Sequence, residues 1–289
     1  MSRALVFGGT GMLGRAVVAE ARRRGHAALG LSHGQADVTD ADRLLYWAEA
    51  FRPDVVVNCA AFTRVDACEE QESRAFEVNG RAVAHVARAA DSAGAALLQV
   101  STDYVFSGEA SEPYDEDAPT DPRSVYGRSK LEGEGHALEA RRSLVVRSSW
   151  LFGPGGPNFV ATILRLVENG PHPLKVVNDQ TGCPTYTPFV ARALWDLIPK
   201  VQSGEVSGVV HYRNREPVTW YDFAREIARL WDRSVEVRPV STDEFPRPAP
   251  RPAYSVLDVT RFERTVGRDV ESWGWGLVEY LASIPSSRS

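Results

Sequence analysis

The chain has 289 residues, of which 43% are hydrophobic and 25% are charged, and its formal net charge is −5. This composition is typical of one large globular domain or two smaller ones. The basic runs at 22–24 and 141–142 lie in helix-like sequence, and no apolar run approaches the length of a membrane span. We therefore expect neither a nucleic acid nor a membrane as a partner.

The first half of the chain alternates predicted strands and helices. Short apolar runs predict strands at 4–7, 27–31, 54–58, 96–101 and 143–149. Helical periodicity and end signals predict helices at 13–25, 39–51, 72–94 and 125–140, of which the third is one long helix or two joined ones. Continuous apolar strands that alternate with helices are typical of a parallel sheet covered on both faces. We therefore predict an α/β fold with a Rossmann-type, doubly wound parallel sheet.

The second half is less regular and predicts a smaller C-terminal α/β substrate-binding lobe. Helices are expected near 158–169, 187–198, 220–231 and 276–283, and strands near 174–177 and 208–212. This predicts a dinucleotide-binding domain at 1–150 and a second lobe at 151–289, whose segments are free to interleave. The proline-rich segment 245–254 is either a flexible linker or an ordered loop. Its position between ordered-looking segments favours the loop.

The cysteines and histidines predict a reduced protein without a metal site. The cysteines, Cys59, Cys68 and Cys183, are too few for a disulfide framework and form no C-x-x-C pair. The histidines are scattered without H-x-H or H-x-x-x-H spacing, so we predict no metal ligand set. The apolar stretch near the N-terminus is too short for a signal peptide. We therefore expect a cytoplasmic protein.

A glycine-rich turn, "GGTGMLG" at 8–14, joins the first predicted strand to the first predicted helix. Gly9, Gly11 and Gly14 form a G-x-G-x-x-G pattern in the strand–turn–helix context that a dinucleotide site requires. Glycine lets the backbone approach a pyrophosphate closely, and the N–H groups of the helix N-terminus then face the anion. The alternative is an ordinary glycine-rich turn, but the context favours dinucleotide binding.

The end of the second predicted strand bears on which dinucleotide binds. An acid at this point usually binds the ribose hydroxyls of NAD. The chain instead has "LSHG" at 31–34, in which no acid would repel a 2′-phosphate and no arginine would hold one. The sequence therefore favours NADPH and leaves NADH open.

A tyrosine and a lysine lie four positions apart in "SVYGRSK" at 124–130. With 9 tyrosines and only 3 lysines in the chain, chance would produce this spacing about 0.1 times (9 × 3/289). On a helix Tyr126 and Lys130 share one face. A free tyrosine has a pKa of about 10, and a neighbouring ammonium lowers it by stabilising the phenolate. We therefore predict that Tyr126 donates a proton to a carbonyl oxygen while hydride reaches the carbonyl carbon.

A hydroxyl near that carbonyl oxygen would hold it in place, and "STDYVF" at 101–106 supplies two candidates, Ser101 and Thr102. They follow a predicted strand at its carboxyl end, where ligands bind in open parallel sheets. Each residue alone has an ordinary structural explanation: a turn for the hydroxyls, a core-edge ring for Tyr126 and a solvated surface charge for Lys130. The combination with a dinucleotide loop favours an active site.

Together these residues resemble an extended short-chain dehydrogenase/reductase, and in particular the dTDP-4-dehydrorhamnose reductase (dTDP-L-rhamnose synthase) family. The resemblance covers nearly the whole chain. Its most specific motifs are "STDYVF" at 101–106, "NDQTGCPT" at 178–185 and "RPAYSVL" at 251–257. It implies NAD(P)H-dependent reduction of the 4-keto group of a nucleotide-sugar, dTDP-4-dehydro-L-rhamnose or a related nucleotide-linked 4-keto-6-deoxyhexose.

The resemblance also implies roles for single residues. Tyr126 is the expected proton donor, Lys130 is expected to bind the nicotinamide ribose, and Thr102 is expected to polarise the 4-keto oxygen. The expected cofactor contacts follow three strands and are Gly8, Thr10, Gly11, Met12, Leu13, Gly14, Ser32, Asp37, Val38, Ala60, Ala61, Phe62 and Thr63, with Tyr126 and Lys130. The expected substrate contacts are Thr102, Asp103, Trp150, Asn158, Gln180 and Arg251.

Two of these substrate residues have plain alternatives. The alternative for Trp150 is a plain interior tryptophan, and the alternative for Arg251 is a surface arginine in a proline-rich loop; the substrate roles are favoured over both. An arginine nevertheless suits a diphosphate, because its fork of donors matches the phosphate oxygens.

The chain departs from some members of this family. Those members dimerise through magnesium held by acidic side chains, one of them just after the glycine loop. Here Arg15 and Ala16 occupy that place, so we predict no such metal site and leave monomer or homodimer open. A related regulatory subunit of methionine adenosyltransferase binds a dinucleotide without turnover. The intact set of Thr102, Tyr126 and Lys130 favours an enzyme instead.

Overall fold

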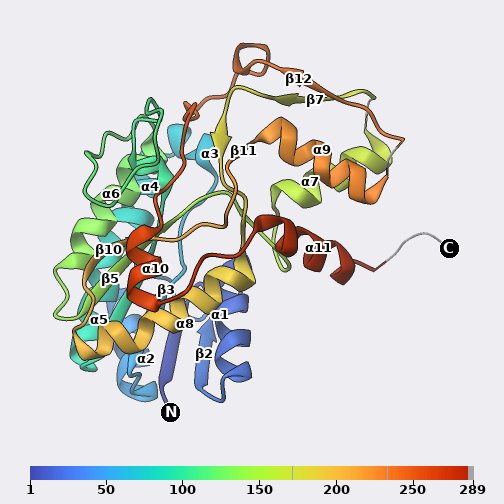
Figure 1. The fold of residues 1–289 in the computed structure, drawn as a ribbon. Helices are drawn as coiled ribbons and strands as arrows, with labels where there is room; N and C mark the ends of the chain where they lie inside the picture. Colours follow the sequence, from blue (N-terminus) through green and yellow to red (C-terminus); the bar gives the residue numbers. More distant parts are fainter. Residues whose placement is uncertain (171, 233, 286–289) are drawn as a thin grey trace.

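A six-stranded parallel sheet forms the centre of the computed structural model, which describes residues 1–170, 172–232 and 234–285 (Figure 1). The strands lie in the order β10-β5-β4-β3-β1-β2, and every neighbouring pair is parallel. They are β1 (Arg3–Phe7), β2 (Ala27–Leu31), β3 (Val55–Asn58), β4 (Ala96–Thr102), β5 (Ser143–Ser148) and β10 (Gly208–His211). The predicted fold class is confirmed. The strand order reverses between β1 and β3, and such a sheet binds ligands in the crevice at the carboxyl ends of these strands.

Alternate side chains of the strands enter two separate cores, as the strand period of two requires. On β1, Ala4 and Val6 pack in one core, whereas Leu5 and Phe7 pack in the other. All four are fully buried, which is why the strands are continuous apolar runs in the sequence. The covering helices are α1 (Met12–Arg23) and α8 (Thr187–Ser203) for the first core, and α2 (Ala41–Phe51), α5 (Ala82–Ser92) and α6 (Val125–Leu138) for the second.

The predicted helix at 72–94 is one continuous run with an altered middle. It consists of α4 (Glu72–Ala75), the π-helical segment η1 (Phe76–Arg81) and α5. A π-helical turn is rare and is found mostly at functional sites. This one carries Asn79, whose side chain reaches the site described below.

The second half of the chain builds a smaller lobe and also completes the first. The lobe contains α7 (Phe159–Asn169), α9 (Trp220–Trp231), α11 (Trp273–Ser283) and the parallel pair of β7 (Leu174–Val177) and β12 (Val237–Val240). In contrast, β10 pairs with β5 in the central sheet, and α8 packs against α1. Segments from beyond residue 150 therefore interleave with the first part of the chain. A domain boundary at that residue stays a prediction.

The remaining elements are short. They are α3 (Val65–Glu70), the 3-10 turns η2 (Asp103–Val105) and η3 (Thr242–Glu244), α10 (Thr260–Val266), β6 (Leu151–Phe152), β8 (Thr181–Gly182), β9 (Thr185–Tyr186) and β11 (Val218–Thr219). None of them was predicted, because runs this short carry little periodicity. Within the ranges that the structure describes, no helix is both long enough and apolar enough to cross a bilayer.

The proline-rich segment 245–254 is ordered, as expected, rather than a flexible linker. The Ala249 backbone N–H and Arg251 Nη2 both donate to Asp66 Oδ1, at 3.3 and 2.9 Å. The Tyr254 backbone N–H donates to the Gly108 carbonyl at 3.0 Å. The segment is therefore attached to α3, which follows β3, and to the loop that follows β4.

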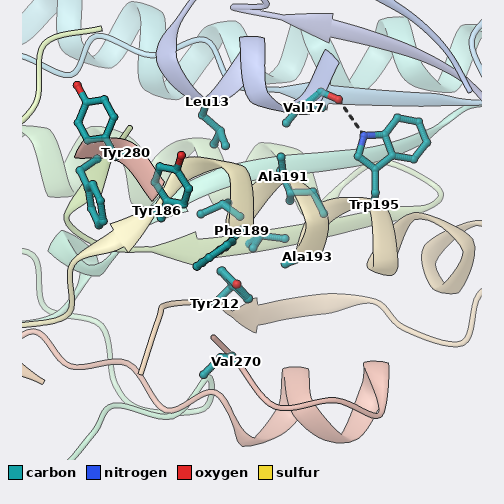
Figure 2. Packing of buried hydrophobic residues seen from close by; sticks show 14 of the residues in the cluster. Leu13, Val17, Tyr186, Phe189, Ala191, Ala193, Trp195, Tyr212, Val270 and Tyr280 are labelled. Atoms are coloured by element: carbon teal, nitrogen blue, oxygen red, sulfur yellow. Dashed lines mark hydrogen bonds between the residues drawn. The ribbon is translucent and has the colours of Figure 1, made fainter. Parts of the chain in front are cut away.

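Trp195 joins α8 to α1 (Figure 2). Its indole Nε1 donates to the Val17 carbonyl at 3.0 Å, and its ring stacks on His26 with centroids 4.7 Å apart. The residue is 2% exposed, so almost all of its large apolar surface is removed from water.

We expect Trp195→Ala to lower the free energy of unfolding by about 3–5 kcal/mol, the usual range for a buried aromatic residue cut to alanine. Urea unfolding followed by circular dichroism measures this. Trp275→Ala is the matched control, because Trp275 on α11 is 67% exposed. It should change the free energy by less than about 0.5 kcal/mol. Equal losses in the two variants would contradict the packing role of Trp195.

Candidate active site

The turn between β1 and α1 is packed so closely that side chains are excluded from it. A Cβ on Gly9 would lie 2.3 Å from Gly30 Cα, and one on Gly14 would lie 2.2 Å from the Gly8 carbonyl oxygen. α1 begins after Gly11, with no side-chain cap and no acid in its first turn. Its first N–H groups therefore have no helical acceptor and carry the partial positive charge of the helix end. These features fit the pyrophosphate of a dinucleotide.

Asn158 holds a loop of the second lobe near this turn. Its Nδ2 donates to the carbonyls of Gly153 and Gly156, at 2.9 and 3.1 Å, and to the Tyr280 hydroxyl at 3.1 Å. Its Oδ1 accepts from the Ala161 backbone N–H at 3.0 Å and so caps α7. Both polar atoms of the side chain are engaged within the protein. The predicted substrate contact of Asn158 stays a prediction.

Arg15, which stands where some family members carry an acid, serves the same turn. Its Nε donates to the Thr10 carbonyl at 2.6 Å. In the described part of the chain, no group of three or more His, Cys, Asp or Glu side chains is arranged to hold a metal ion.

The residues expected beside the adenosine follow β2. The Ser32 backbone N–H and hydroxyl both donate to Gln35 Oε1, at 3.0 and 2.9 Å. Val38 is 4% exposed and packs in the second core. Ser32 therefore stabilises a tight turn at the end of β2, and Val38 anchors the chain after that turn in the second core.

Asp37 is an anion placed among cations at this end of the site. It accepts hydrogen bonds from the Thr39 backbone N–H and hydroxyl, and His33 Nε2 lies 3.6 Å from its carboxylate. Partial burial raises the pKa of Asp37, but the Thr39 hydrogen bonds and the charges of His33 and Arg74 outweigh it and lower the pKa overall. The sequence motif at 31–34 gave no sign of Arg74, which approaches from α4.

Asn79 clamps the turn after β3, which holds the predicted cofactor contacts Ala60, Ala61, Phe62 and Thr63. Its Oδ1 accepts from the Phe62 backbone N–H at 2.7 Å, and its Nδ2 donates to the Phe62 carbonyl at 3.1 Å. The same Nδ2 donates to Ser129 Oγ at 3.1 Å on α6. One buried amide therefore fixes the expected cofactor loop against the helix that carries Tyr126 and Lys130. The sequence analysis gave Asn79 no role, and its own helix, which also carries charged residues such as Glu77 and Arg81, does not single it out.

Thr102 and Tyr126 meet at the carboxyl end of β4. Thr102 is the last residue of β4, and its hydroxyl donates to Asp103 Oδ1 at 3.0 Å. Tyr126 lies in the first turn of α6, where the Thr102 hydroxyl is close enough to lower the phenol pKa by hydrogen bonding. Successive side chains on a strand point to opposite faces, so Ser101 faces away from this pair. Thr102 is therefore the better of the two hydroxyl candidates.

The environment of Tyr126 differs from the one that its spacing predicted. Burial raises the pKa of Tyr126 above its ordinary value; Thr102 opposes this rise, and Asp103 and Tyr104 add to it. The prediction of a lowered pKa is therefore wrong for this structure, because loss of solvation outweighs any charge effect. The raised pKa keeps the phenol protonated at neutral pH, which is the form that can donate a proton.

Lys130 is buried, with 4% of its surface exposed, and its Nζ donates to the Val100 carbonyl on β4 at 2.7 Å. Burial lowers the pKa of Lys130 to about 8, while Glu134 and Cys59 act to raise it. The ammonium therefore lies between the end of β3 and the end of β4, one helical turn from Tyr126.

Buried polar atoms without a hydrogen-bond partner gather around the ends of β4 and β5. They are Ser101 Oγ, Asp103 Oδ2, Ser148 Oγ and Ser255 Oγ. Such atoms are costly to bury and are normally paired. The Ser255 hydroxyl lies near Asp103 and lowers its pKa, but burial has the larger effect and raises that pKa to about 6. Except for Ser101, which faces away from Thr102, these atoms are suited to the hydroxyls of a bound sugar.

Trp150 is held in an unusual conformation immediately after β5. Its φ is 46°, a region that bulky residues rarely adopt. The indole stacks on Trp220 with centroids 3.4 Å apart and an angle of 3° between the rings. A Cβ on Gly182 would lie 2.4 Å from the indole, so only glycine fits there. An outlier kept by packing favours a functional role, and the deoxysugar contact of Trp150 stays a prediction.

A cavity of about 790 Å³ lies between the smaller lobe and the central part of the protein. Apolar side chains of α7 and β7 and the face of Trp220 line one side, and Asp66 and Tyr104 line the other. Tyr104 meets Tyr126 edge-on, with ring centroids 5.5 Å apart. The cavity therefore adjoins the predicted catalytic residues.

The cavity brings two predicted substrate residues together and adds two cations. Gln180 lines it and donates to Thr242 Oγ1 at 2.9 Å. Arg251 lines it and pairs with Asp66 at 2.9 Å. Lys175 and Arg247 also line the cavity, although the sequence analysis named neither. Three cations, an amide and an apolar wall suit a ligand that carries both phosphate and ring groups.

The fold and the site define the class of protein. A glycine-rich turn at the reversal point of the sheet, with a hydroxyl, a tyrosine and a buried lysine beside it, is the arrangement of a dinucleotide-dependent oxidoreductase of the extended short-chain dehydrogenase/reductase type. A neighbouring cavity of substrate size completes it.

Comparison with known proteins identifies the family. Residues 2–285 match the family model described as RmlD substrate binding domain. A dTDP-4-dehydrorhamnose reductase from Streptomyces griseus is 42% identical over 98% of this chain and 94% of its own. The structure of dTDP-4-dehydrorhamnose reductase from Bacillus anthracis, in complex with NADP, has a TM-score of 0.92 at 33% identity and covers 98% of this chain and 99% of that one. The chain belongs to the dTDP-4-dehydrorhamnose reductase family.

A further relative differs in its named substrate. A probable dTDP-4,6-dihydroxy-2-methyloxan-3-one 4-ketoreductase from Streptomyces antibioticus is 39% identical over 98% of this chain and 95% of its own. Identity at this level therefore extends to relatives that are named for different sugars.

Asp103 offers a test of the site through stability. Its carboxyl is 2% exposed, with a pKa raised from 3.8 to about 6. A raised acid pKa means that the folded state binds more protons than the unfolded state between these values, so stability falls as the pH rises through this window. We expect Asp103→Asn to raise the free energy of unfolding at pH 8 by on the order of 2–3 kcal/mol. At pH 4 the gain should be small.

Urea unfolding of the wild type and the variant at both pH values measures this difference. Asp243→Asn, at an exposed carboxylate in the 3-10 turn η3, is the control and should show no such pH dependence. A destabilised Asp103→Asn variant at pH 8 would show that the carboxylate is well satisfied within the protein.

Proposed function

We propose that this protein reduces the 4-keto group of dTDP-4-dehydro-L-rhamnose to give dTDP-L-rhamnose, with NADPH as the reductant and NADH as a possible substitute. The observation that carries the proposal is the meeting of the Thr102 hydroxyl and the protonated Tyr126 phenol at the end of β4. This pair lies between a dinucleotide cradle and a cavity of substrate size. The family relationship and the names of the relatives support the same reaction.

The residues of the chain have distinct roles in this reaction. When bound, the reduced nicotinamide supplies the hydride. When the substrate binds, the Thr102 hydroxyl turns its proton from Asp103 Oδ1 to the 4-keto oxygen, where it donates a hydrogen bond and draws charge toward that oxygen. Tyr126 gives its proton to that oxygen as negative charge develops. Lys130 holds the nicotinamide ribose and places positive charge one turn from the phenol.

The cavity residues account for the rest of the substrate. Arg251, Arg247 and Lys175 are placed to neutralise the diphosphate. Asp103 and the unpaired hydroxyls near it are placed to bind hydroxyls of the deoxysugar. Gln180 and the apolar wall face the remainder of the nucleotide, and Trp150 supports the sugar from beside Trp220.

The cofactor proposal follows from the fit of the chain to a dinucleotide. The excluded side chains at Gly9 and Gly14 and the uncapped start of α1 favour a pyrophosphate there. Arg74 lies at the adenosine end, where its charge favours the extra charge of a 2′-phosphate over a free hydroxyl. NADPH is therefore the preferred partner in this proposal.

A second substrate is favoured by one specific observation. The 39% identity to a probable dTDP-4,6-dihydroxy-2-methyloxan-3-one 4-ketoreductase supports a related nucleotide-linked 4-keto sugar as the alternative substrate. In that case the reaction and the roles of Thr102, Tyr126 and Lys130 stay the same, and only the sugar changes. A purely regulatory dinucleotide binder would have no need of this set.

The proposal places the enzyme in the cytoplasm, where nucleotide-sugars and reduced nicotinamides are available and where its three free cysteines would stay reduced. Monomer and homodimer both fit it.

The direct test is turnover. The protein is mixed with dTDP-4-dehydro-L-rhamnose, and the loss of reduced-nicotinamide absorbance is followed with NADPH and NADH in parallel. We expect oxidation of the cofactor with dTDP-L-rhamnose as the product, faster with NADPH at limiting cofactor. Oxidation only with another nucleotide-linked 4-keto sugar would show that this other sugar is the substrate. Cofactor binding without oxidation of any such sugar would leave only a regulatory binder.

A Tyr126→Phe variant tests the mechanism. Removal of the proton donor should lower kcat by about 100- to 10,000-fold, the usual contribution of a general acid. NADPH affinity, measured by fluorescence titration, should change little because the ring stays in place. Val125→Ala, at the preceding position of α6, controls for disturbance of the helix. Near wild-type turnover by Tyr126→Phe would overturn the assigned role.

A further inference from the structure

A buried ion pair joins α6, the helix that carries Tyr126 and Lys130 and is called the catalytic helix below, to β5. Arg147 on β5 donates to Glu134 on α6 through Nε, at 2.9 and 3.2 Å to the two carboxylate oxygens, and through Nη2 at 2.7 Å. The two side chains are only 5% and 3% exposed. Burial of two charges costs desolvation that their attraction rarely exceeds by much, so such a pair is weak evidence for stability alone. Its presence calls for another explanation.

Arg147 is held from three sides. Besides Glu134, its guanidinium lies over the Phe106 ring, 5.1 Å from the centroid, and its Nη1 lies 3.4 Å from His211 Nε2. Burial and the charge of Arg147 lower the pKa of His211 to about 3, so this imidazole is neutral and adds no second positive charge. These contacts place Glu134 beside Arg147, and neither side chain can move without breaking them.

Glu134 also lies four residues after Lys130 on α6, so the two side chains share one face of the helix. Lys130 is buried, and the protein gives its Nζ a backbone carbonyl, that of Val100. An ammonium in such surroundings tends to lose its proton unless a negative charge lies near it. Glu134 supplies that charge, and Arg147 fixes where it is.

We propose that Glu134, held in place by Arg147, is a positioning residue that keeps Lys130 protonated at the cofactor site. The proposal rests on the proposed function for the importance of a charged Lys130, but the protonation state itself is measurable without turnover. The pair also ties α6 to β5, so the same contacts set the register of the catalytic helix on the sheet.

The groups that face Lys130 define the sign of the effect. Tyr126 and Glu134 approach from its own helix, Cys59 approaches from the end of β3, and β4 contributes the Val100 carbonyl. Burial raises the pKa of the Cys59 thiol to about 12, so it is neutral near pH 8. Glu134 is then the negative charge among these groups. Its removal lowers the pKa of Lys130, and the ammonium loses its proton at a lower pH.

The chain offers an unusually clean measurement, because it has only three lysines, Lys130, Lys175 and Lys200. Lysine labelled with ¹³C at Cε gives three resonances, and Lys130→Met identifies the one of interest. We expect the wild-type Lys130 resonance to titrate near pH 8. In Glu134→Gln, which removes the carboxylate charge and keeps Arg147, we expect its midpoint to fall by about one pH unit or more. In the double variant Glu134→Met/Arg147→Met, which leaves no unpaired buried charge, we expect a smaller fall, because the loss of the Arg147 cation acts in the opposite direction.

Two matched variants separate charge from scaffolding. Glu132→Gln removes a carboxylate from the same helix on a different face and should leave the Lys130 midpoint unchanged. Arg147→Lys keeps a cation beside Glu134 and should retain most of the wild-type midpoint. If the double variant does not fold, Glu134→Gln carries the same test. A Lys130 midpoint within about 0.2 pH units of wild type in the variants without Glu134 would overturn the proposal.

A binding measurement links the effect to the site. NADPH affinity followed by fluorescence between pH 6 and pH 9 should fall at a lower pH in the double variant than in the wild type. If the wild type turns over no 4-keto sugar but the Lys130 midpoint shifts as expected, the proposed substrate fails and this inference stands. If the wild type turns over the substrate normally but the Lys130 midpoint is unchanged in the variants without Glu134, the proposed function stands and this inference fails.

Discussion

The burial of the predicted catalytic and substrate-binding side chains is the constraint on which the rest of the site depends. Lys130, Thr102 and Asp103 are each less than a tenth exposed, and a buried polar or charged group destabilises the fold unless a partner compensates it. The partners are consequently specific: a backbone carbonyl for Lys130 and the Asp103 carboxylate for Thr102. The same exclusion of water strengthens electrostatic interactions at this site, including those with the charge that the proposed reaction develops.

The sheet brings these groups together because parallel strands present all their carboxyl ends at one edge. The turns after β1 and β3 flank the point where the strand order reverses, and β4 follows next in the sheet. A cofactor bound along the turns after β1 and β3 therefore extends toward Thr102 at the end of β4. Asn79 makes this arrangement rigid, because its single amide is bonded to both the cofactor turn and α6. Asn79 lies in the π-helical segment η1, so this local distortion of the helix sets the position of its amide.

Local sequence patterns predicted the parts of this structure that depend on local physics. Buried strands such as β3 are apolar runs, and the glycine turn carries its own signature, so both could be placed from the sequence. The pairing of Tyr126 with Lys130 follows from helical spacing alone. The pKa of Tyr126 was predicted in the wrong direction, because burial depends on residues distant in the sequence, such as Tyr104 and Asp103. No local pattern reports that loss of solvent.

Contacts across long stretches of chain were likewise beyond the sequence. Asn158 was expected to meet the substrate, yet its amide spans 122 residues to reach the Tyr280 hydroxyl. Arg251 pairs with Asp66 across 185 residues, and nothing near either residue indicates the other. Lys175 and Arg247 entered the cavity lining in the same way, since β7 and the proline-rich segment meet only in the folded lobe. Residue type suggested which chemistry was available, whereas tertiary packing decided where it was used.

The two ion pairs near the site differ in burial, and this difference suits them to different tasks. Arg251 and Asp66 keep 19% and 34% of their side chains exposed, and a pair of this kind typically contributes only ~0–1 kcal/mol. Arg251 can therefore exchange the carboxylate for a diphosphate at little cost in stability. Arg147 and Glu134 are almost fully buried, and separation of such a pair leaves an uncompensated charge in the interior. The first pair therefore suits the proposed role of Arg251, which requires a change of partner, and the second suits a charge that stays in one place.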